Sequence, residues 1–522
     1  MFSKINYITL LIYIALSTLA FFSNFYIASR GLFPVDSFIH YDFGYRILLG
    51  DDPVRDYWIV HGFVIDYIQA FFFKIFGNNW HSYLFHSSIF NVIIVIFTFF
   101  ILRDLNVSLK KTLLVSISTS FLAYPVSGTP FLDLHSTFFS LFAIYLVIIS
   151  IAKNKIFLWF YVFILLFLAF LSKQVPAAYT IIGVSILNLY FTIFRKNLKI
   201  FLYFLTGGVF SLLTLFVFLL LNKISITDFI FQILIFPPSI GIDRYEKYNL
   251  TFKNLVLDYK FIYIIFIPLI LINVINFWTK VRYTSSKEFE IFLVILVFTC
   301  STLFHQVYTK NQVYIFFLIP ILSGLFFYYE KFINKRFRLF SNLLVILICI
   351  FVTFKYHQRF NLERKFHELT NVNISNHADA IIIDEKLKGL KWITPYSKDP
   401  NREIQIINDF IFVLKKDKDN KILITEYNFL SSLLNENLNA PSRTYDLISY
   451  PRKNSKYFQN YKDFLINKIK NKKIKKIYVF EPFSKYDHNE IILNYISESC
   501  FDKDDTNKSF TIYKIKNCNY LR

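Results

Sequence analysis

The chain has 522 residues, and its composition excludes an ordinary soluble protein. It holds 65 Phe and 35 Tyr, and only 18% of its residues are charged, against about 25% in soluble domains. The net charge is +21, but the Lys and Arg residues lie in short clusters between apolar runs and in the C-terminal third. This distribution is typical of proteins in which positive charge determines the membrane topology. We therefore expect an integral membrane protein in contact with membrane lipid, and no binding of nucleic acid.

Eleven apolar runs approach or exceed the length of about 20 residues that crosses a bilayer. They are residues 5–28, 82–102, 112–127, 134–152, 156–173, 175–194, 200–221, 260–278, 289–308, 312–329 and 339–356. The first run lacks a small-residue cleavage site, which predicts a retained helix rather than a removed signal peptide. The pattern predicts an α-helical polytopic membrane domain over residues 1–356, with about eleven transmembrane helices.

Basic clusters between these runs predict the side on which each loop lies, because positive residues mark cytoplasmic loops. The five clusters lie at residues 103–111, 153–155, 195–199, 280–282 and 331–338. With a cytoplasmic N-terminus, all five lie in the cytoplasm, whereas loops 29–81 and 222–259 and the chain after His357 lie outside. We therefore expect a multi-pass protein of the cytoplasmic (inner) membrane whose C-terminal domain is periplasmic or otherwise extracytoplasmic.

Two further apolar segments are expected to lie along the outer membrane surface. Residues 57–76, YWIVHGFVIDYIQAFFFKIF, could span the bilayer, but counting them as a crossing would move the basic cluster at 103–111 outside. We interpret this segment as an interfacial helix in loop 29–81. In loop 222–259, TDFIFQILIF begins with the capping pair Thr227 and Asp228 and precedes Pro237-Pro238, which predicts a second interfacial helix that ends at the prolines.

The composition becomes polar after His357, and its periodicity predicts alternating helices and strands. Helices are expected at 402–417, 460–472 and 488–497, and strands at 421–427, 475–482 and 509–516. This alternation predicts a small α/β domain over residues 357–522. Cys500 and Cys518 lie in this domain, where they either form a disulfide or remain two buried thiols. No cysteine spacing in the chain is typical of a zinc site.

The first outer loop contains DSFIHYDFGYRILLGDDPVRDYW, which places five aspartates between residues 36 and 58. Asp36 or Ser37 is a suitable N-cap and Gly50 a suitable residue after a helix end, so a helix is expected at 37–49. The face of this helix that carries Phe38 and Tyr41 is expected to rest on lipid. By its local chemistry alone, Asp36 is a plain N-cap.

The other charges of this helix and its turn have simple interpretations. Asp42 and Arg46 are four residues apart, so we expect them to form a solvated salt bridge on the helix surface. Asp51 and Asp52 are expected to be solvated turn residues.

The spacing of this loop resembles that of the GT-C glycosyltransferases, the multipass enzymes that take sugars from polyprenyl phosphate. Members related to bacterial lipopolysaccharide-modifying and protein-mannosylating enzymes often carry an acid pair near the end of the first helix. An A-x-x-L-x-x-G-x-x-P-Y-x-D run follows, then P-L or G-P-L, and then an apolar helix ending in F-G. The counterparts here are Asp36, YRILLGDDPVRDYW and HGFVIDYIQAFFFKIFG, within about residues 30–105. Ser37, Val54 and Phe63 stand where the family carries its second acid, its aromatic residue and its second proline.

The resemblance implies transfer of a hexosyl or pentosyl group, with inversion, from a polyprenyl-phosphate sugar to a glycan, lipid or protein acceptor outside the cytoplasm. The acceptor hydroxyl loses a proton as it attacks, and a carboxylate at the membrane surface can take that proton. Asp36 is the expected base. Asp56 is expected to position the acceptor or to share a cation, and its alternative is a loop carboxylate paired with Arg55.

The leaving lipid phosphate requires cations, and basic side chains outside the cytoplasm are the candidates for substrate binding. They are Arg55, His61, Lys173, Arg244, His305 and Lys310. Lys173 is equally well explained as a lysine that extends to the membrane surface. For Arg244, an ion pair with Asp243 or Glu246 is favoured over ligand binding. The sequence indicates no cofactor with certainty, and it leaves a divalent metal open.

Three other functions compete with this interpretation. A transporter or flippase of lipid-linked sugars would place ionisable groups near the bilayer midplane, often within internal repeats, whereas most charges here lie at helix ends and no repeat is found. A surface polysaccharide polymerase or ligase would share the chemistry with another acceptor. A membrane anchor without activity would leave the Asp36-to-Asp56 spacing unexplained.

Overall fold

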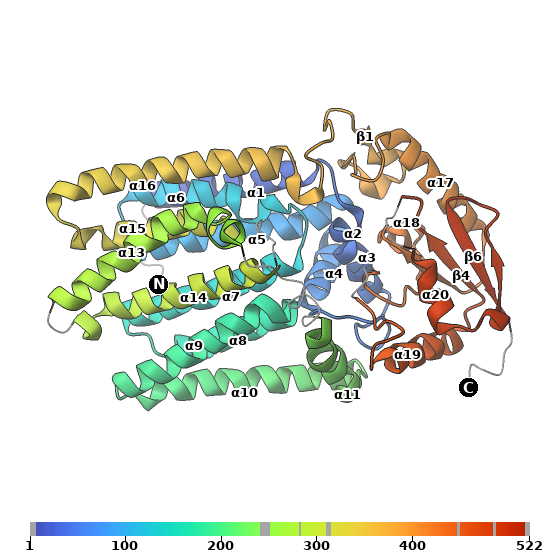
Figure 1. The fold of residues 1–522 in the computed structure, drawn as a ribbon, viewed down its shortest axis with the longest axis horizontal. Coiled ribbons are helices and arrows are strands. Elements are labelled where there is room, and N and C mark those ends of the chain that lie inside the picture. Colours follow the sequence, from blue (N-terminus) through green and yellow to red (C-terminus); the bar gives the residue numbers. More distant parts are fainter. Residues whose placement is uncertain are drawn as a thin grey trace. The chain divides into compact units, whose positions relative to one another are not determined.

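The computed structural model describes residues 7–240, 251–280, 283–309, 315–445, 449–483 and 487–516, and these form two compact units (Figure 1). The helical unit comprises Met1–Ala28, Leu84–Phe216 and Arg244–Phe366. The mixed unit comprises Ser29–Tyr83, Val217–Asp243 and His367–Arg522. The mixed unit thus combines two loops of the apolar part of the chain with the polar C-terminal part.

Each of the eleven predicted apolar runs contains a helix. They are α1 (Tyr7–Ala28), α5 (Trp80–Asp104), α6 (Leu109–Leu122), α7 (Leu132–Lys153), α8 (Leu158–Ser172), α9 (Gln174–Phe194), α10 (Leu198–Leu221), α13 (Lys260–Thr279), α14 (Lys287–Thr309), α15 (Leu318–Tyr329) and α16 (Lys335–Tyr356). Within the described residues, eight helical segments are long and apolar enough to cross a membrane; α6, α8 and α15 are shorter. The prediction of a polytopic α-helical membrane protein is confirmed.

Small residues let the helices of the helical unit pack closely, as is common between membrane helices. At Gly183 of α9, a Cβ atom would lie 2.3 Å from the Val297 side chain of α14. At Gly207 of α10, it would lie 2.3 Å from the carbonyl oxygen of Phe160 of α8. Short turns of helix join the long ones: η1 (Tyr124–Val126), η3 (Lys253–Leu257), η4 (Tyr283–Ser285), η6 (Glu330–Phe332), η7 (His357–Leu362) and η8 (Lys365–His367).

The mixed unit contains the α/β fold that the C-terminal sequence predicts. Its helices are α2 (Pro34–Ser37), α3 (Ile39–Leu48), α4 (Val64–Phe76), α11 (Ile226–Ile230), η2 (Phe231–Ile235), η9 (Ala380–Ile382), η10 (Glu385–Leu387), α17 (Pro400–Lys416), α18 (Leu430–Leu434), α19 (Phe458–Asn471), α20 (Asn489–Tyr495) and η11 (Glu498–Cys500). Its strands are β1 (Ala378–Asp379), β2 (Lys391–Trp392), β3 (Lys421–Thr425), β4 (Lys476–Phe480), β5 (Phe501–Asp504) and β6 (Phe510–Ile515). All six predicted C-terminal elements are present.

Four of these strands form one sheet in the order β3-β4-β6-β5. β3 runs parallel to β4, with Lys421 opposite Lys476, whereas β6 runs antiparallel to both of its neighbours. The core against this sheet joins all three segments of the unit, because Trp58 of the first loop and Phe236 of the second pack with Ile422 of β3. The two loops are therefore part of the same hydrophobic core as the C-terminal sheet.

This shared core constrains the membrane topology, because segments of one compact unit must lie on the same side of a membrane. Six helices, α5 to α10, connect the first loop to the second, and four helices, α13 to α16, connect the second loop to the C-terminal segment. If each of these helices crosses the membrane once, both connections make an even number of crossings, so all three segments of the mixed unit lie on the same side. The segment 57–76 contributes only the 13-residue α4, which belongs to the mixed unit and is too short to cross.

The first loop differs from its predicted structure in one main respect: its aromatic helix face is covered by protein rather than lipid. The expected helix 37–49 is divided into α2 and α3, and Asp36 lies in the first turn of α2 rather than at an N-cap. Phe38 is fully buried against Trp392 and Phe429 of the C-terminal segment. The predicted helix end is confirmed, since Gly50 follows α3 with a φ of +90°.

Four smaller predictions for the loops are also wrong. Arg46 pairs with Asp51 instead of Asp42, and Asp42, Asp51 and Asp52 are buried rather than solvated. In the second loop, Ser225 rather than the pair Thr227 and Asp228 caps α11, and its hydroxyl accepts a hydrogen bond from the Asp228 amide. The helical segment continues through both prolines to Ile240, since Pro237 and Pro238 lie in a new helical turn.

Candidate functional site

The mixed unit brings together most of the acidic residues that the sequence singles out. Six aspartates lie between residues 29 and 83, and four of them are buried: Asp42, Asp51, Asp52 and Asp66. Asp36 and Asp56 are the two that keep part of their surface exposed. These two are also the residues that the family spacing marks as candidate catalytic groups.

Asp36 lies in the first turn of α2, which begins at Pro34. Pro34 suits this position, because the first residue of a helix needs no amide hydrogen. The neighbouring Ser37 is buried, and its hydroxyl accepts a hydrogen bond from the Phe33 amide at 3.1 Å. Across from α2 lies Tyr396, whose ring contacts Phe33. Burial raises the pKa of Tyr396, and the nearby charges of Glu426 and Asp36 raise it further.

Asp51 is held by the buried guanidinium of Arg46. The Nε and Nη2 atoms of Arg46 lie 3.0 and 2.8 Å from Asp51 Oδ2, and Nη1 donates to the carbonyl oxygen of Ala440 at 2.9 Å. Asn437 donates a further hydrogen bond to the same carboxylate oxygen at 2.7 Å. Burial by itself would raise the pKa of Asp51, but the charges of Arg46 and Lys468 outweigh it and lower this pKa to about 2.

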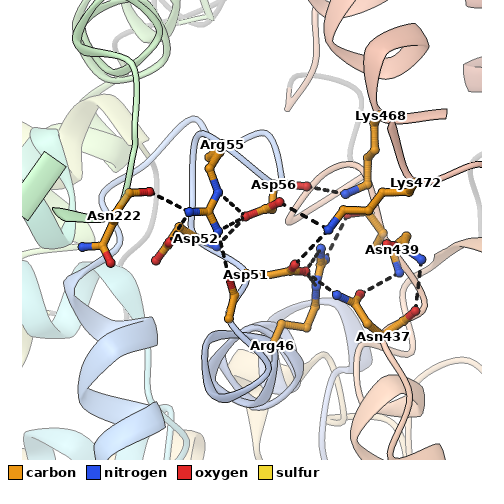
Figure 2. A network of polar contacts seen from close by, with 12 residues as sticks. Arg46, Asp51, Asp52, Arg55, Asp56, Asn222, Asn437, Asn439, Lys468 and Lys472 are labelled. Carbon is orange, nitrogen blue, oxygen red and sulfur yellow. Dashed lines mark hydrogen bonds and ion pairs between the residues drawn. The ribbon is translucent and has the colours of Figure 1, made fainter. Parts of the chain in front are cut away.

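Arg55 bridges two carboxylates of the same loop (Figure 2). Its Nη1 lies 2.9 Å from Asp52 Oδ2, and its Nη2 lies 2.6 Å from Asp56 Oδ2. The guanidinium also donates to the carbonyl oxygens of Asn222, at 2.6 Å, and Gly50, at 2.7 Å. The structure therefore contains the ion pair that the sequence offers as the alternative to ligand binding by Asp56 and Arg55.

Two lysines that sequence reasoning missed complete this network (Figure 2). Lys468 of α19 is buried and donates a hydrogen bond to the backbone carbonyl oxygen of Asp56. Burial and the nearby Arg46 charge lower the pKa of Lys468 to about 7, although Asp51 and Asp56 oppose the shift. Lys472 Nζ lies 3.7 Å from Asp51 and 3.6 Å from Asp56. Lys468 lies in the last turn of α19 and Lys472 directly after it, and no nearby residue in the sequence indicates their acidic partners.

His61 and Asp66 belong to a second buried network. Arg443 donates to Asp66 Oδ2 at 2.8 Å and to the carbonyl oxygens of Gly62 and His61 at 2.9 and 3.1 Å. The other Asp66 oxygen lies 2.5 Å from Nδ1 of the buried His40. Burial would raise the pKa of Asp66, but the charges of Arg443 and His40 lower it. This arrangement fixes the start of α4 against the C-terminal segment.

The helical unit has its own charged cluster, which brings together two of the predicted phosphate ligands. Lys173, directly after α8, lies 2.7 Å from Asp133 Oδ2 in the first turn of α7. His305, near the end of α14, lies 3.3 Å from the other oxygen of Asp133. Asp133 was missed, although a carboxylate at the start of an apolar run is a recognised signal of function.

A histidine pair lies one helical turn or less from that cluster. His86 Nε2 and His135 Nε2 are 2.8 Å apart, and the Tyr124 hydroxyl lies 2.6 Å from His135 Nδ1. His135 shares the first turn of α7 with Asp133. The start of α7 therefore brings an ion pair and a histidine pair together within one turn of helix.

Two further predicted ligands, Arg244 and Lys310, lie outside the described residues. Cys518 does as well, so its disulfide with the buried Cys500 stays a prediction. Among the residues that the structure describes, no group of three or more His, Cys, Asp or Glu side chains is arranged to hold a metal ion.

Residues 60–220, about a third of the chain, match the family model for dolichyl-phosphate-mannose-protein mannosyltransferases. No curated protein matches the chain. The matched segment begins just after Asp56 and contains α4, α5 and the Asp133–Lys173 pair. The match confirms the resemblance to the GT-C superfamily, and together with the membrane-spanning helices it supports a membrane glycosyltransferase of the GT-C type.

Proposed function

We propose that the protein transfers a sugar from a polyprenyl-phosphate donor to a hydroxyl group of a glycan, lipid or protein acceptor, with Asp36 as the general base. The matching family is described by its use of dolichyl phosphate mannose, which supports this donor class. The observation that favours Asp36 is its exposure, because four of the six loop aspartates are buried. Asp56, the other partly exposed loop aspartate, accepts hydrogen bonds from Arg55 and from the Asp52 amide, and the family spacing places Asp36 at the acid position next to the first helix.

A single carboxylate suits an inverting transfer. The acceptor oxygen attacks the anomeric carbon from the side opposite the phosphate, the bond to the phosphate breaks, and the base takes the acceptor proton. A retaining reaction by double displacement would require a carboxylate nucleophile as well as a base. Ser37 stands where relatives carry a second acid, and its hydroxyl is buried in a hydrogen bond to the Phe33 amide.

The departing lipid phosphate carries the charge that basic groups must stabilise, and we assign this role to Lys173 and His305. Both side chains meet at Asp133, at the start of α7. Lys173 has three hydrogen-bond donors, of which Asp133 takes one, so donors are left for a phosphate oxygen. Asp133 holds both side chains in place before the donor binds.

The test of the base is the variant Asp36→Asn. Asn has nearly the same size as Asp, and Asp36 is not the N-cap of α2, so folding should survive. Turnover of a polyprenyl-phosphate sugar in membranes should fall about a hundredfold or more, the usual contribution of a general base. Turnover within a factor of two of the parent protein, at equal abundance, would exclude Asp36 as the base.

The matched control is Asp379→Asn, which removes the same charge from the same unit. Asp379 is exposed and pairs with Lys391 on the surface. Its loss should leave turnover unchanged. An equal decrease in both variants would indicate that the net charge of the mixed unit, and not a base at Asp36, determines the rate.

We further propose that the N-terminus lies in the cytoplasm and the mixed unit outside, in the cytoplasmic membrane. The five basic clusters support this orientation. A reporter enzyme that works only in the cytosol should be active when fused before the first helix and silent when fused after Arg522. The reverse pattern would contradict this orientation, although the three segments of the mixed unit would still lie on one side of the membrane.

A further inference from the structure

The mixed unit contains a cleft of about 620 Å³ to which the proposed reaction assigns no role. Its size lies within the range of about 300–1,000 Å³ that is typical of small-molecule sites. Three segments line it: residues 54–58 of the first loop, residues 223–232 around α11, and the helix α19 with Lys472. These segments come from all three parts of the unit's sequence.

A row of polar side chains on α19 faces this cleft. Its members are Asn460, Asp463, Asn467 and Asn471, which recur every three or four residues and therefore share one side of the helix. Within the described residues, the three asparagine side chains make no hydrogen bond to the rest of the protein. Each amide offers one acceptor and two donor hydrogens to a ligand.

Aromatic rings form a second part of the lining. Phe231 and Phe464 are half-buried, and both pack edge-on against the buried ring of Trp58, at centroid distances of 5.9 and 5.7 Å. Such rings offer an apolar surface beside the amides. A ligand that fits both parts has hydrogen-bonding groups at its edge and carbon–hydrogen faces.

The charges of the lining argue against a phosphate or other strong anion as the main ligand. Four cationic residues line the cleft, but three carboxylates do so as well: Asp56, Asp228 and Asp463. Arg55 is bound to two carboxylates, and Lys468 donates to the Asp56 carbonyl oxygen. A hydroxyl group both donates and accepts, so it matches amides and carboxylates together.

Charged contacts connect part of the cleft lining to the rest of the unit (Figure 2). Arg55, Asp56, Lys468 and Lys472 belong to the charged network that joins the first loop to α19. Val54, which lines the cleft beside them, has a φ of +73°, a conformation that a β-branched residue rarely adopts. Its carbonyl oxygen accepts a hydrogen bond from the Gln232 side chain at 3.2 Å, which ties the loop to the helix that follows α11.

We propose that this cleft binds a neutral saccharide, whose hydroxyl groups bond to the amides of α19 and whose ring face packs on Phe231 and Phe464. The saccharide is the glycan part of the acceptor. That assignment to the acceptor rests on the proposed sugar transfer, whereas the lining supports saccharide binding by itself. Asp56 then contributes to a wall of the acceptor cleft rather than to proton transfer.

Direct binding to the full-length protein in detergent tests the proposal. The probes are fluorescently labelled neutral tri- to pentasaccharides of glucose, mannose, galactose and N-acetylglucosamine, with a sulfated oligosaccharide as the anionic comparison. At least one neutral probe should bind, and Asn467→Ala with Asn471→Ala should weaken it about tenfold or more by removing two hydrogen-bonding groups. Ala favours helix more than Asn does, so α19 should persist.

Lys470→Ala is the control, because Lys470 is exposed on α19 outside the cleft lining and its loss should leave the dissociation constant unchanged. The proposal is wrong if no neutral probe binds, if only the sulfated probe binds, or if the double variant binds as tightly as the parent protein.

A second measurement separates the acceptor assignment from the base. The bound saccharide, unlabelled, should inhibit sugar transfer in parent membranes and inhibit it about tenfold less potently in the double variant. Absence of inhibition would overturn the acceptor assignment. The same saccharide should bind Asp36→Asn as tightly as the parent protein. Full turnover of Asp36→Asn would therefore exclude Asp36 as the base but would not bear on saccharide binding in the cleft. Loss of saccharide binding in that variant would show that the cleft is not separate from Asp36.

Discussion

Arg46 and Arg443 of the mixed unit and Lys173 of the helical unit each hold a buried carboxylate at 2.7 or 2.8 Å, yet they differ in what else they contact. Arg46 and Arg443 are buried and also bind backbone carbonyl oxygens from segments remote in sequence. Lys173 is partly exposed, and its ammonium group donates to Asp133. A buried charge whose hydrogen bonds join segments remote in sequence holds a fold together, whereas a partly exposed charge with donors to spare can bind a substrate.

The strongest way to break this comparison is to remove Arg443. In Arg443→Met, Asp66 would remain buried with only His40 beside it, which should destabilise the mixed unit by about 3–5 kcal/mol. We expect loss of a cooperative thermal transition and of the monodisperse peak in size-exclusion chromatography. Arg443→Met with Asp66→Leu should recover part of the stability, since no uncompensated charge is left. A single variant as stable as the parent protein would show that Arg443 is not structural.

A slightly smaller effect is expected at Glu403, which is buried with hydrogen bonds from Thr394 and Tyr427. Burial raises the pKa of Glu403 from 4.5 to about 7. The folded state therefore binds a proton that the unfolded state has released between pH 4.5 and 7, so this group's stabilising contribution is complete below pH 4.5 and disappears as pH rises through 7. The loss is about 3 kcal/mol.

Glu403→Gln tests this pH dependence, because it removes the titration. Thermal stability in detergent should fall from pH 5 to pH 8 in the parent protein and fall less in the variant. Parallel profiles would contradict the assignment. Lys468 has the opposite effect on stability at higher pH. Its pKa of about 7 lies below the ordinary 10.5, so its contribution to stability increases from pH 7 upwards. It should therefore not hide the decrease in stability that Glu403 causes between pH 5 and 7.

Lys173→Gln sharpens the comparison from the other side. If Lys173 binds the donor phosphate, the variant should require about tenfold more polyprenyl-phosphate sugar for half-maximal turnover, a loss of about 1.4 kcal/mol, with little change in thermal stability. The measurement is the initial rate at varied donor concentration. Lys153→Gln is the control, since Lys153 is an exposed lysine of the same unit paired with Asp104. A loss of folding in Lys173→Gln without a change in donor affinity would class Lys173 with the structural arginines.

The smallest effect is expected on the surface of the mixed unit. Lys391 and Asp379 form an exposed pair across β1 and β2. Lys391→Ala should change the free energy of unfolding by less than about 1 kcal/mol, because exposed pairs are well screened by water. A larger change in the midpoint of thermal unfolding would mean that exposure does not separate structural from dispensable charges in this unit.

Much of the secondary structure could be predicted from the sequence, since apolar runs and helical or strand periodicity depend on neighbouring residues. The partners of the charges could not. Arg46 was assigned to Asp42, four residues before it, but the turn at Gly50 returns the chain so that Asp51 meets the guanidinium instead. Asn437 and Ala440, which complete that site, lie almost 400 residues away, and no local pattern indicates them.

The same reasoning explains what was right and what was missed at the candidate site. The family spacing pointed to Asp36 and Asp56, which are the two loop aspartates with exposed surface. The predicted topology pointed to Lys173 and His305 as basic side chains outside the cytoplasm, and these two share a partner. That partner, Asp133, was missed because it lies directly before an apolar run that was interpreted only by its hydropathy, as a membrane helix. The cleft along α19 was missed because its asparagines have meaning only beside residues of the two loops.

The shared core of the mixed unit determines how late during synthesis this unit can complete its folding. Arg46 and the Ala440 carbonyl are separated by 394 residues, and Arg443 and the Asp66 carboxylate by 377. At synthesis rates of about 5–20 residues per second, the first loop waits about 20–80 seconds for the segment that covers Phe38 and binds its charges. During that interval its aromatic face is exposed to lipid or chaperones. Nascent chains truncated before residue 430 should therefore be captured by quality-control proteases even when every membrane helix is already inserted.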